Sequence, residues 1–192
     1  ADRLKEIEPF RVVEVLTRGK QLAAEGRDIV RLEAGEPDFS TAEPIIAAAQ
    51  ASLGRGETHY SQAAGIPELR EAISRYYKRD YGLDVAPGRI MITPGASGAL
   101  LLISGLLLNP GQGILMTDPG YPCNRNFFRL VEGEGQLVPV GPEDRYQLNA
   151  AKAEAAWRDN TVGAIVASPA NPTGEILTSD ELRDLHALCQ PE

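Results

Sequence analysis

The stretch Ala164-Ile-Val-Ala-Ser-Pro-Ala-Asn-Pro-Thr-Gly-Glu175 joins a run of strand-forming residues to a loop that contains two prolines. Proline has no backbone N–H and a fixed φ, and it pushes the residue before it into an extended conformation. Pro169 therefore ends the strand, and Asn171, which precedes Pro172, is kept out of a helix just beyond the strand's carboxyl end. In open α/β sheets ligands bind at that end of the strands. The amide of Asn171 is therefore a candidate ligand contact.

The rest of the chain alternates between predicted strands and helices, which favours a parallel sheet with helices on its faces. We expect strands at 89–93, 113–117, 136–140 and 162–167, and helices at 97–108, 123–131, 150–157 and 179–189. Before them we expect a helix over 7–25, a short strand at 28–32, and helices at 43–53 and 67–81. The predicted fold class is α/β, a mostly parallel sheet flanked by helices and preceded by an N-terminal helical segment.

Composition excludes several classes of function. The 192 residues carry a formal net charge of −8 and no basic run, so a nucleic-acid partner is not expected. The longest apolar stretch, Ala99 to Leu108, is too short to span a membrane. Cys123 and Cys189 are not at metal-ligand or redox-pair spacing, and neither His59 nor His186 has a partner at ligand spacing, so we predict no metal site. Two free thiols favour a reducing compartment, and we expect a cytoplasmic protein.

A second candidate site is the turn Thr93-Pro-Gly-Ala-Ser-Gly-Ala99, between an expected strand and an expected helix. A helix N-terminus has unpaired N–H groups and the positive end of the helix dipole, so it can bind an anion. Gly95 and Ala96 allow close approach to the backbone, and Ser97 adds a hydroxyl. The same residues also fit a plain turn with a serine cap. A nucleophilic Ser97 is a weak alternative, because position 99 is alanine and His186, the candidate base, lies in an expected helix.

Three further residues are ambiguous when taken alone. Tyr121, in Asp118-Pro-Gly-Tyr-Pro122, could stack on a planar ligand or simply pack over the sheet edge. Gly35 could offer its backbone N–H to a ligand or serve only as a turn glycine. The role of Tyr60 is equally ambiguous when this residue is taken alone. Asn171, likewise, could form an Asx turn with its own backbone.

The positions of Ser97, Tyr121 and Asn171 are more informative together than singly. Each follows a separate predicted strand at its carboxyl end, and parallel strands place those ends along one edge of the sheet. An anion-binding turn, an aromatic face and an amide at one edge suit a flat, phosphorylated heteroaromatic ligand.

A series of motifs resembles the class I/II aminotransferases, which are fold-type I pyridoxal-phosphate enzymes. The motifs are Gly35-Glu-Pro-Asp-Phe39, Tyr60 followed by Gly65-Ile-Pro-Glu-Leu-Arg70, Thr93-Pro-Gly-Ala-Ser-Gly-Ala-Leu100, Asp118-Pro-Gly-Tyr-Pro122 and Ser168-Pro-Ala-Asn-Pro-Thr-Gly174. They occur in order over nearly the whole chain. The resemblance implies that residues 1–34 contribute to a small domain or arm. Residues 35–192 would then be the first part of a large pyridoxal-phosphate-binding domain, with the remainder of both domains missing.

The resemblance also implies roles for the cofactor-binding residues. Gly95, Ala96 and Ser97 would bind the phosphate of pyridoxal 5′-phosphate through backbone N–H groups and the serine hydroxyl. Tyr121 would stack on the pyridine ring. Asn171 would donate a hydrogen bond to the ring's phenolic oxygen, which favours the ionised oxygen. The family often has a cis peptide in this motif, so we expect the bond between Asn171 and Pro172 to be cis.

For substrates and partners, the resemblance implies an amino acid and a 2-oxo acid that exchange an amino group. Gly35 would offer its backbone N–H to the substrate carboxylate. Tyr60 would reach the cofactor phosphate of the other subunit, because the family's site lies at a homodimer interface.

One part of the family's machinery is not matched in this chain. The Schiff-base lysine, the aspartate that pairs with the pyridine nitrogen and the arginine that binds the substrate carboxylate are all expected beyond residue 192. Lys5, Lys20, Lys78 and Lys152 do not lie in a matching context. Because the chemistry needs that amine, we expect residues 1–192 alone to be inactive. Two alternatives stay open: a fold-type I C–S lyase or other pyridoxal-phosphate elimination enzyme, and a catalytically inactive binding module of the same fold.

Overall fold

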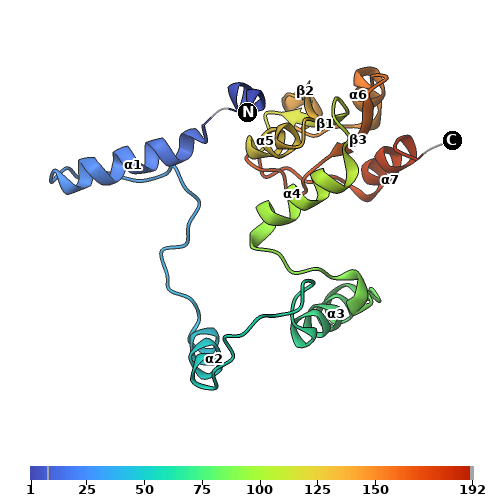
Figure 1. Cartoon of the computed structure of the whole chain (residues 1–192). Coiled ribbons are helices and arrows are strands. Elements are labelled where there is room, and N and C mark those ends of the chain that lie inside the picture. Colours follow the sequence, from blue (N-terminus) through green and yellow to red (C-terminus); the bar gives the residue numbers. More distant parts are fainter. Residues whose placement is uncertain (8, 191–192) are drawn as a thin grey trace. The chain divides into compact units, whose positions relative to one another are not determined.

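The computed structural model describes residues 1–7 and 9–190, and the chain divides into two compact units. The first unit consists of Ala1–Arg11 and Ser97–Glu192, and the second of Val12–Ala96 (Figure 1). The first unit contains the sheet and three of the six predicted cofactor-binding residues, Ser97, Tyr121 and Asn171. The division of the complete protein into domains at residue 34 stays a prediction.

A three-stranded parallel sheet forms the centre of the first unit. Its strands are β1 (Gly113–Asp118), β2 (Glu134–Pro139) and β3 (Thr161–Ile165), in the spatial order β2-β1-β3. In register, Asp118 of β1 pairs with Pro139 of β2, and Met116 pairs with Ile165 of β3. The first four residues of β1 are consecutively buried, as expected for a central parallel strand with both faces covered. This arrangement confirms the predicted α/β class.

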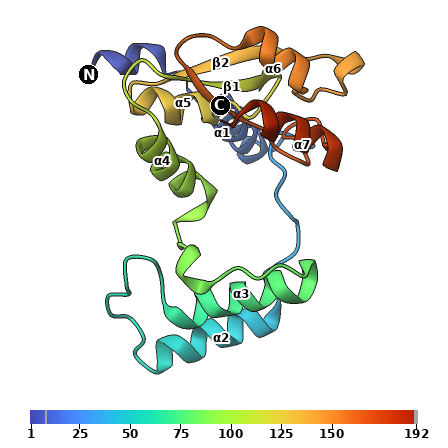
Figure 2. The ribbon, with the colours of Figure 1, turned by 90° about the vertical axis from the view of Figure 1, so that its right-hand side faces the viewer.

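Helices cover both faces of this sheet. They are α4 (Gly95–Leu107), α5 (Cys123–Leu130), α6 (Ala150–Ala156) and α7 (Ser179–Leu188), with short 3-10 turns η1 (Asp2–Glu6) and η3 (Pro142–Asp144). Successive side chains of β1 point to opposite faces, so Leu115 packs in one core cluster while Ile114 and Met116 pack in the other. Figure 2 shows β1 and β2 side by side with α5 next to them. The first cluster contains residues of α6 and α7, and the second contains Phe128 of α5.

The second unit contains α1 (Arg11–Ala24), α2 (Glu43–Gly54), α3 (Pro67–Tyr81) and η2 (Pro87–Arg89). Helix α3 has the bounds that the sequence predicts. Proline starts it, and Gly82, with a φ of 69°, ends it by donating its N–H to the carbonyls of Tyr77 and Lys78. Arg70 ties α3 to the following turn, since its guanidinium donates to the carbonyls of Pro87 and Ile90.

Two predicted strands, 28–32 and 89–93, are wrong: neither range forms a strand among the described residues. Ile90 is extended, with φ −110° and ψ 125°, and Ile92 donates its N–H to the carbonyl of Ala64 at 3.0 Å. An extended segment becomes a strand only when a neighbour supplies a hydrogen-bonded ladder, and these segments have none within residues 1–7 and 9–190. The helix expected over 7–25 begins only at Arg11, after the separate turn η1.

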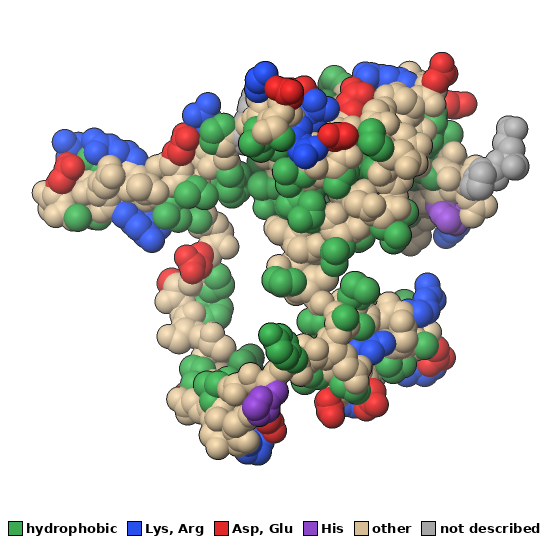
Figure 3. Space-filling model, in the orientation of Figure 1, with side chains coloured by type: hydrophobic (Ala, Val, Ile, Leu, Met, Phe, Trp, Pro, Cys, Tyr) green, Lys and Arg blue, Asp and Glu red, His purple; other side chains and the backbone are tan. Residues whose placement is uncertain are grey.

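Helix α4 exposes a large apolar surface. Its exposed side chains are Leu101, Leu102, Ile103, Leu106 and Leu107, with exposed fractions between 41% and 81%. Figure 3 shows hydrophobic side chains on the outside of this helix. An apolar surface of this kind is typical of an interface. In the described part of the chain, no helix combines the length and the apolar composition that crossing a membrane requires.

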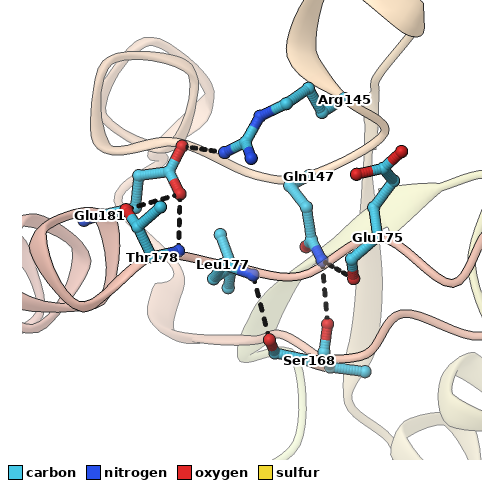
Figure 4. Close-up of polar contacts among 8 residues, drawn as sticks. Arg145, Gln147, Ser168, Glu175, Leu177, Thr178 and Glu181 are labelled. Atoms are coloured by element: carbon cyan, nitrogen blue, oxygen red, sulfur yellow. Dashed lines mark hydrogen bonds and ion pairs between the residues drawn. The ribbon is translucent and has the colours of Figure 1, made fainter.

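The contacts at the start of α7 lead to a testable prediction about how stability depends on pH. The Glu181 carboxylate accepts hydrogen bonds from the Thr178 N–H and hydroxyl at 2.7 and 2.8 Å and pairs with Arg145 (Figure 4). These contacts, with the Thr178 N–H first, lower the pKa of Glu181 from 4.5 to about 2. A lowered pKa means that this stabilisation is complete above pH 4.5 and is lost as the pH falls toward 2. The stability difference between wild type and Glu181→Gln, measured by thermal denaturation, should therefore shrink between pH 6 and pH 2.

The matched control for this pH series is Glu154→Gln, which changes an exposed glutamate of α6. Its stability difference from wild type should stay near zero at every pH. A Glu181→Gln difference that is constant with pH would contradict the assigned contacts.

Candidate functional site

The loops that carry Tyr121 and Asn171 leave the same edge of the sheet. Tyr121 lies between the end of β1 and the start of α5, and Asn171 lies between the end of β3 and the start of α7. Because β1 and β3 are parallel neighbours, their carboxyl ends lie side by side. Ser97, in the first turn of α4, belongs to the same compact unit. The joint contact of Ser97, Tyr121 and Asn171 with one ligand stays a prediction.

Tyr121 is half-buried and held by an aromatic neighbour. Its ring meets the ring of Phe10 edge to face, with centroids 6.2 Å apart and an interplanar angle of 76°. The peptide bond between Asp118 and Pro119, which opens this loop, is cis. A hydrogen bond with the Cys123 thiol, and then burial, raise the pKa of Tyr121 above 10, so its phenol is protonated at neutral pH. Phe10 belongs to none of the motifs that predicted the site.

The N-terminal segment that carries Phe10 is attached to helix α5 and the residues that follow it. Arg3 pairs with Glu132 at 2.7 Å, and Glu6 of η1 pairs with Arg129 of α5. These two ion pairs, with opposite polarity, place η1 against α5. As a result, residues about 110 positions apart in sequence meet beside Tyr121.

Asn171 is exposed, and its side-chain amide makes no hydrogen bond to any residue that the structure describes. The Asx turn considered as its alternative role is therefore not formed there, and the amide is available to a ligand. The peptide bond between Asn171 and Pro172 is cis, as expected, and so is the bond between Ser168 and Pro169.

Internal hydrogen bonds close the loop around Asn171. The N–H of Ala170 donates to the carbonyl of Glu175, and the N–H of Gly174 donates to the carbonyl of Ala170, both at 2.8 Å. The N–H of Leu177 donates to Ser168 Oγ at 2.9 Å (Figure 4). Asn171 thus lies inside a short loop whose backbone is fixed by its own contacts.

A buried glutamine, Gln147, holds both ends of this loop. Its Nε2 donates to the carbonyl of Ala167 at 3.0 Å and to the carbonyl of Glu175 at 2.8 Å, and the residue is 3% exposed (Figure 4). Gln147 is not among the residues that the sequence predicts for this site. A single polar residue between Tyr146 and Leu148 belongs to no motif or period that could have indicated it.

The first turn of α4 has the features expected of an anion site. Gly95 has a φ of 71°, and a Cβ built there would meet no atom within 4 Å, so the backbone is open to approach. Ala96 and Ser97 are exposed in this turn, where the N–H groups have no carbonyl partner within the helix. The Thr93 hydroxyl donates to the carbonyl of Gly95 at 2.8 Å and helps to fix the turn.

The remaining predicted contacts lie in the second unit. Tyr60 is fully exposed, and Gly35 lies in an exposed loop with open space around it. Both are free to contact another molecule, and their roles stay predictions.

Three of the four lysines form ion pairs with residues that the structure describes. Lys5 pairs with Asp2, Lys78 with Asp84, and Lys152 with Asp144. Lys152 also donates to the carbonyl of Pro139, the last residue of β2, at 3.1 Å. This amine therefore lies at the carboxyl end of the sheet, but it is bound to a carboxylate whose pKa it lowers.

Comparison with known protein families gives one match over most of the chain. Residues 27–191 match the family described as aminotransferase class I and II. The chain is 38% identical over 186 residues to the valine–pyruvate aminotransferase of Mycobacterium tuberculosis, covering 95% of this chain and 47% of that protein. It is also 38% identical over 175 residues to the (5-formylfuran-3-yl)methyl phosphate transaminase of Methanocaldococcus jannaschii, covering 91% and 45%.

Solved structures give the same result. The crystal structure of an aminotransferase from Mycobacterium tuberculosis matches with a TM-score of 0.92 and 38% identity, over 98% of this chain and 48% of that one. The aspartate aminotransferase of Thermus thermophilus with maleate matches with a TM-score of 0.92 and 33% identity, over 98% and 49%. The chain therefore spans about half the length of the relatives it matches.

Proposed function

Because this chain belongs to the class I and II aminotransferases, a family that depends on pyridoxal 5′-phosphate, we propose that it forms the cofactor-binding part of such an enzyme. The complete protein would move an amino group between an amino acid and a 2-oxo acid. The observation that carries the proposal is that half-buried Tyr121 and Asn171, whose amide bonds to no described residue, lie in loops that leave neighbouring parallel strands at the same edge of the sheet. Ligands of open α/β sheets bind at this edge.

The residues present fit the chemistry of pyridoxal phosphate. Its phosphate needs N–H and hydroxyl donors, which Ala96 and Ser97 can supply at the exposed start of α4. The Gly95 N–H instead donates to the Thr93 carbonyl at 2.8 Å, so at Gly95 the open backbone allows close approach of the phosphate. Its flat ring needs an aromatic face, which Tyr121 offers, and its phenolic oxygen needs a donor, which is the Asn171 amide. When bound, the cofactor supplies an electron-withdrawing ring that stabilises negative charge on the substrate carbon.

The chain's own residues orient the cofactor and tune its charge. Asn171 donates a hydrogen bond that favours the ionised form of the phenolic oxygen. The Tyr121 phenol is neutral at pH 7, as for any tyrosine of ordinary pKa, so it would add no negative charge beside that oxygen. Phe10 supports the Tyr121 ring by an edge-to-face contact, with the ring centroids 6.2 Å apart.

Substrate and partner contacts come from the second unit. Gly35 offers its N–H to the substrate carboxylate, and Tyr60 reaches the cofactor phosphate of a second subunit in a homodimer. Two observations support the dimer. The Tyr60 side chain is fully exposed to solvent, and several leucine side chains of α4 are exposed as well. The cytoplasmic location stays a prediction from the two free cysteines.

Activity measurements on the complete protein and on residues 1–192 alone test this proposal. The complete protein should convert a 2-oxo acid to an amino acid. Chromatography of the products, repeated over a panel of amino donors, measures this conversion. Residues 1–192 alone should give no turnover, because none of their four lysines lies in the context of the Schiff-base lysine.

Each other outcome of this assay points to a different function. Release of a thiol or ammonia by the complete protein would indicate the lyase. Cofactor binding without any turnover by the complete protein would indicate the inactive binding module. Turnover by residues 1–192 alone would contradict the assigned need for a further lysine.

A further inference from the structure

The loop that carries Asn171 is held by a side chain that lies outside the loop. Residues 168–174 lie between Ala167 and Glu175, whose carbonyls both accept hydrogen bonds from the Gln147 amide, at 3.0 and 2.8 Å. We propose that Gln147 is a positioning residue, which sets how the Asn171 amide is presented to the cofactor. This inference rests on the proposed function, and it adds a residue that belongs to none of the motifs that indicated the family.

The backbone delivers Gln147 to this place at a conformational cost. The two residues before it, Arg145 and Tyr146, both have a φ of 52°, in the left-handed region that residues other than glycine rarely adopt. The Tyr146 N–H donates to the carbonyl of Gly141 at 2.9 Å, which closes this turn. Such conformations persist where the surrounding contacts determine them. Here they turn Gln147 and the fully buried Leu148 inward.

The chemistry of a primary amide suits this position. Its two N–H donors can bond two carbonyls at once and so connect the two ends of the loop. A methionine of similar length would fill the same space and leave both carbonyls without this donor. The far end of the loop has a second attachment, since Leu177 is 7% exposed in the same core cluster as Leu148. Gln147 therefore acts on the loop ends rather than on the packing of the core.

Gln136 provides a matched control. It is also a buried glutamine, 2% exposed, and its Nε2 donates to Asn160 Oδ1 at 2.9 Å. It accepts a hydrogen bond from the Thr161 hydroxyl at 2.5 Å. Thr161 begins β3, so these contacts lie toward the amino end of that strand, away from the Asn171 loop. Gln136→Met should lower stability in a similar way without affecting the loop.

The first measurement is hydrogen–deuterium exchange of peptides covering 168–177 in the complete protein, without cofactor. Gln147→Met should raise exchange there by about tenfold relative to Gln136→Met, after correction for any change in global stability. The affected donors are the N–H groups of Ala170, Gly174 and Leu177. Equal exchange in the two variants would overturn the proposal. If Gln147→Met does not fold, Gln147→Asn keeps the amide but shortens it by one methylene, so that it can no longer reach both carbonyls. It should raise exchange in the same peptides, and no rise would overturn the proposal.

The second measurement is a double-mutant cycle on pyridoxal-phosphate affinity, followed by absorbance. Gln147→Met should weaken binding by about tenfold, and Gln136→Met by less than about twofold. In an Asn171→Ala background, Gln147→Met should have almost no further effect, because Gln147 acts through Asn171. Fully additive effects would overturn the positioning role. A wild type that binds no cofactor would refute the proposed function instead, and the exchange comparison would then decide alone whether Gln147 holds the loop.

Discussion

Leu115→Ala is expected to lower the free energy of unfolding of the sheet-containing unit by about 3–5 kcal/mol. Leu115 is fully buried at the centre of β1 and packs in the core cluster with Val138, Leu148 and Leu185. Removing its side chain both loses buried apolar surface and leaves a cavity. The whole free energy of unfolding of a small domain is only about 5–15 kcal/mol, so this loss is a large share of it. Urea unfolding followed by fluorescence of Trp157, the single tryptophan, measures it, since Trp157 packs against the same cluster.

Leu137→Ala is the control for this change. Leu137 lies on the adjacent strand β2, but its side chain is 42% exposed. The same chemical change should therefore cost less than about 1 kcal/mol. Equal losses for the two variants would contradict the division between a buried central strand and a half-exposed neighbour.

Elements bounded by local signals could be predicted from the sequence. Helix α3 is bounded by Pro67 and Gly82, and α7 begins with the hydrogen-bonded box of Thr178 and Glu181. These signals act through backbone geometry within a few residues, so they work without knowledge of the rest of the fold. The parallel sheet followed from the alternation of such elements.

Elements that depend on distant partners could not be predicted in the same way. The segments 28–32 and 89–93 have strand-forming residues, yet neither is a strand among the described residues. Val30 is 81% exposed, which shows how little of the first segment is covered by other residues of its unit. β propensity measures how well a residue fits a pleated, half-buried surface, and that surface must come from elsewhere in the fold.

The same distinction between local signals and distant contacts applies to the residues of the candidate site. Ser97, Tyr121 and Asn171 could be proposed because they lie in motifs next to prolines and glycines at strand ends. Phe10 and Gln147 could not, because their importance comes from contacts with residues far away in sequence. Motifs therefore predicted which groups would contact a ligand, and only the structure identified the neighbouring groups that hold them.

Asn171→Ala is expected to weaken pyridoxal-phosphate binding to the complete protein by about 10- to 100-fold, the value of a hydrogen bond to a charged oxygen. The fold should not change: Asn171 is exposed, and its side chain bonds to no described residue, so the free energy of unfolding should stay within about 0.5 kcal/mol of wild type. Titration with the cofactor, followed by absorbance, and urea unfolding measure the two effects separately.

The control for Asn171→Ala is Asn109→Ala. Asn109 lies in the loop before β1, and its side-chain amide donates a hydrogen bond to Gln112. That loop precedes the amino end of the strand, so the cofactor affinity of Asn109→Ala should stay within about twofold of wild type. Asn171→Asp should bind even more weakly than Asn171→Ala, because a carboxylate cannot donate and repels an ionised oxygen. If all three variants bound the cofactor as wild type does, Asn171 would not contact it. The sheet edge would then lose the donor on which the proposed function depends.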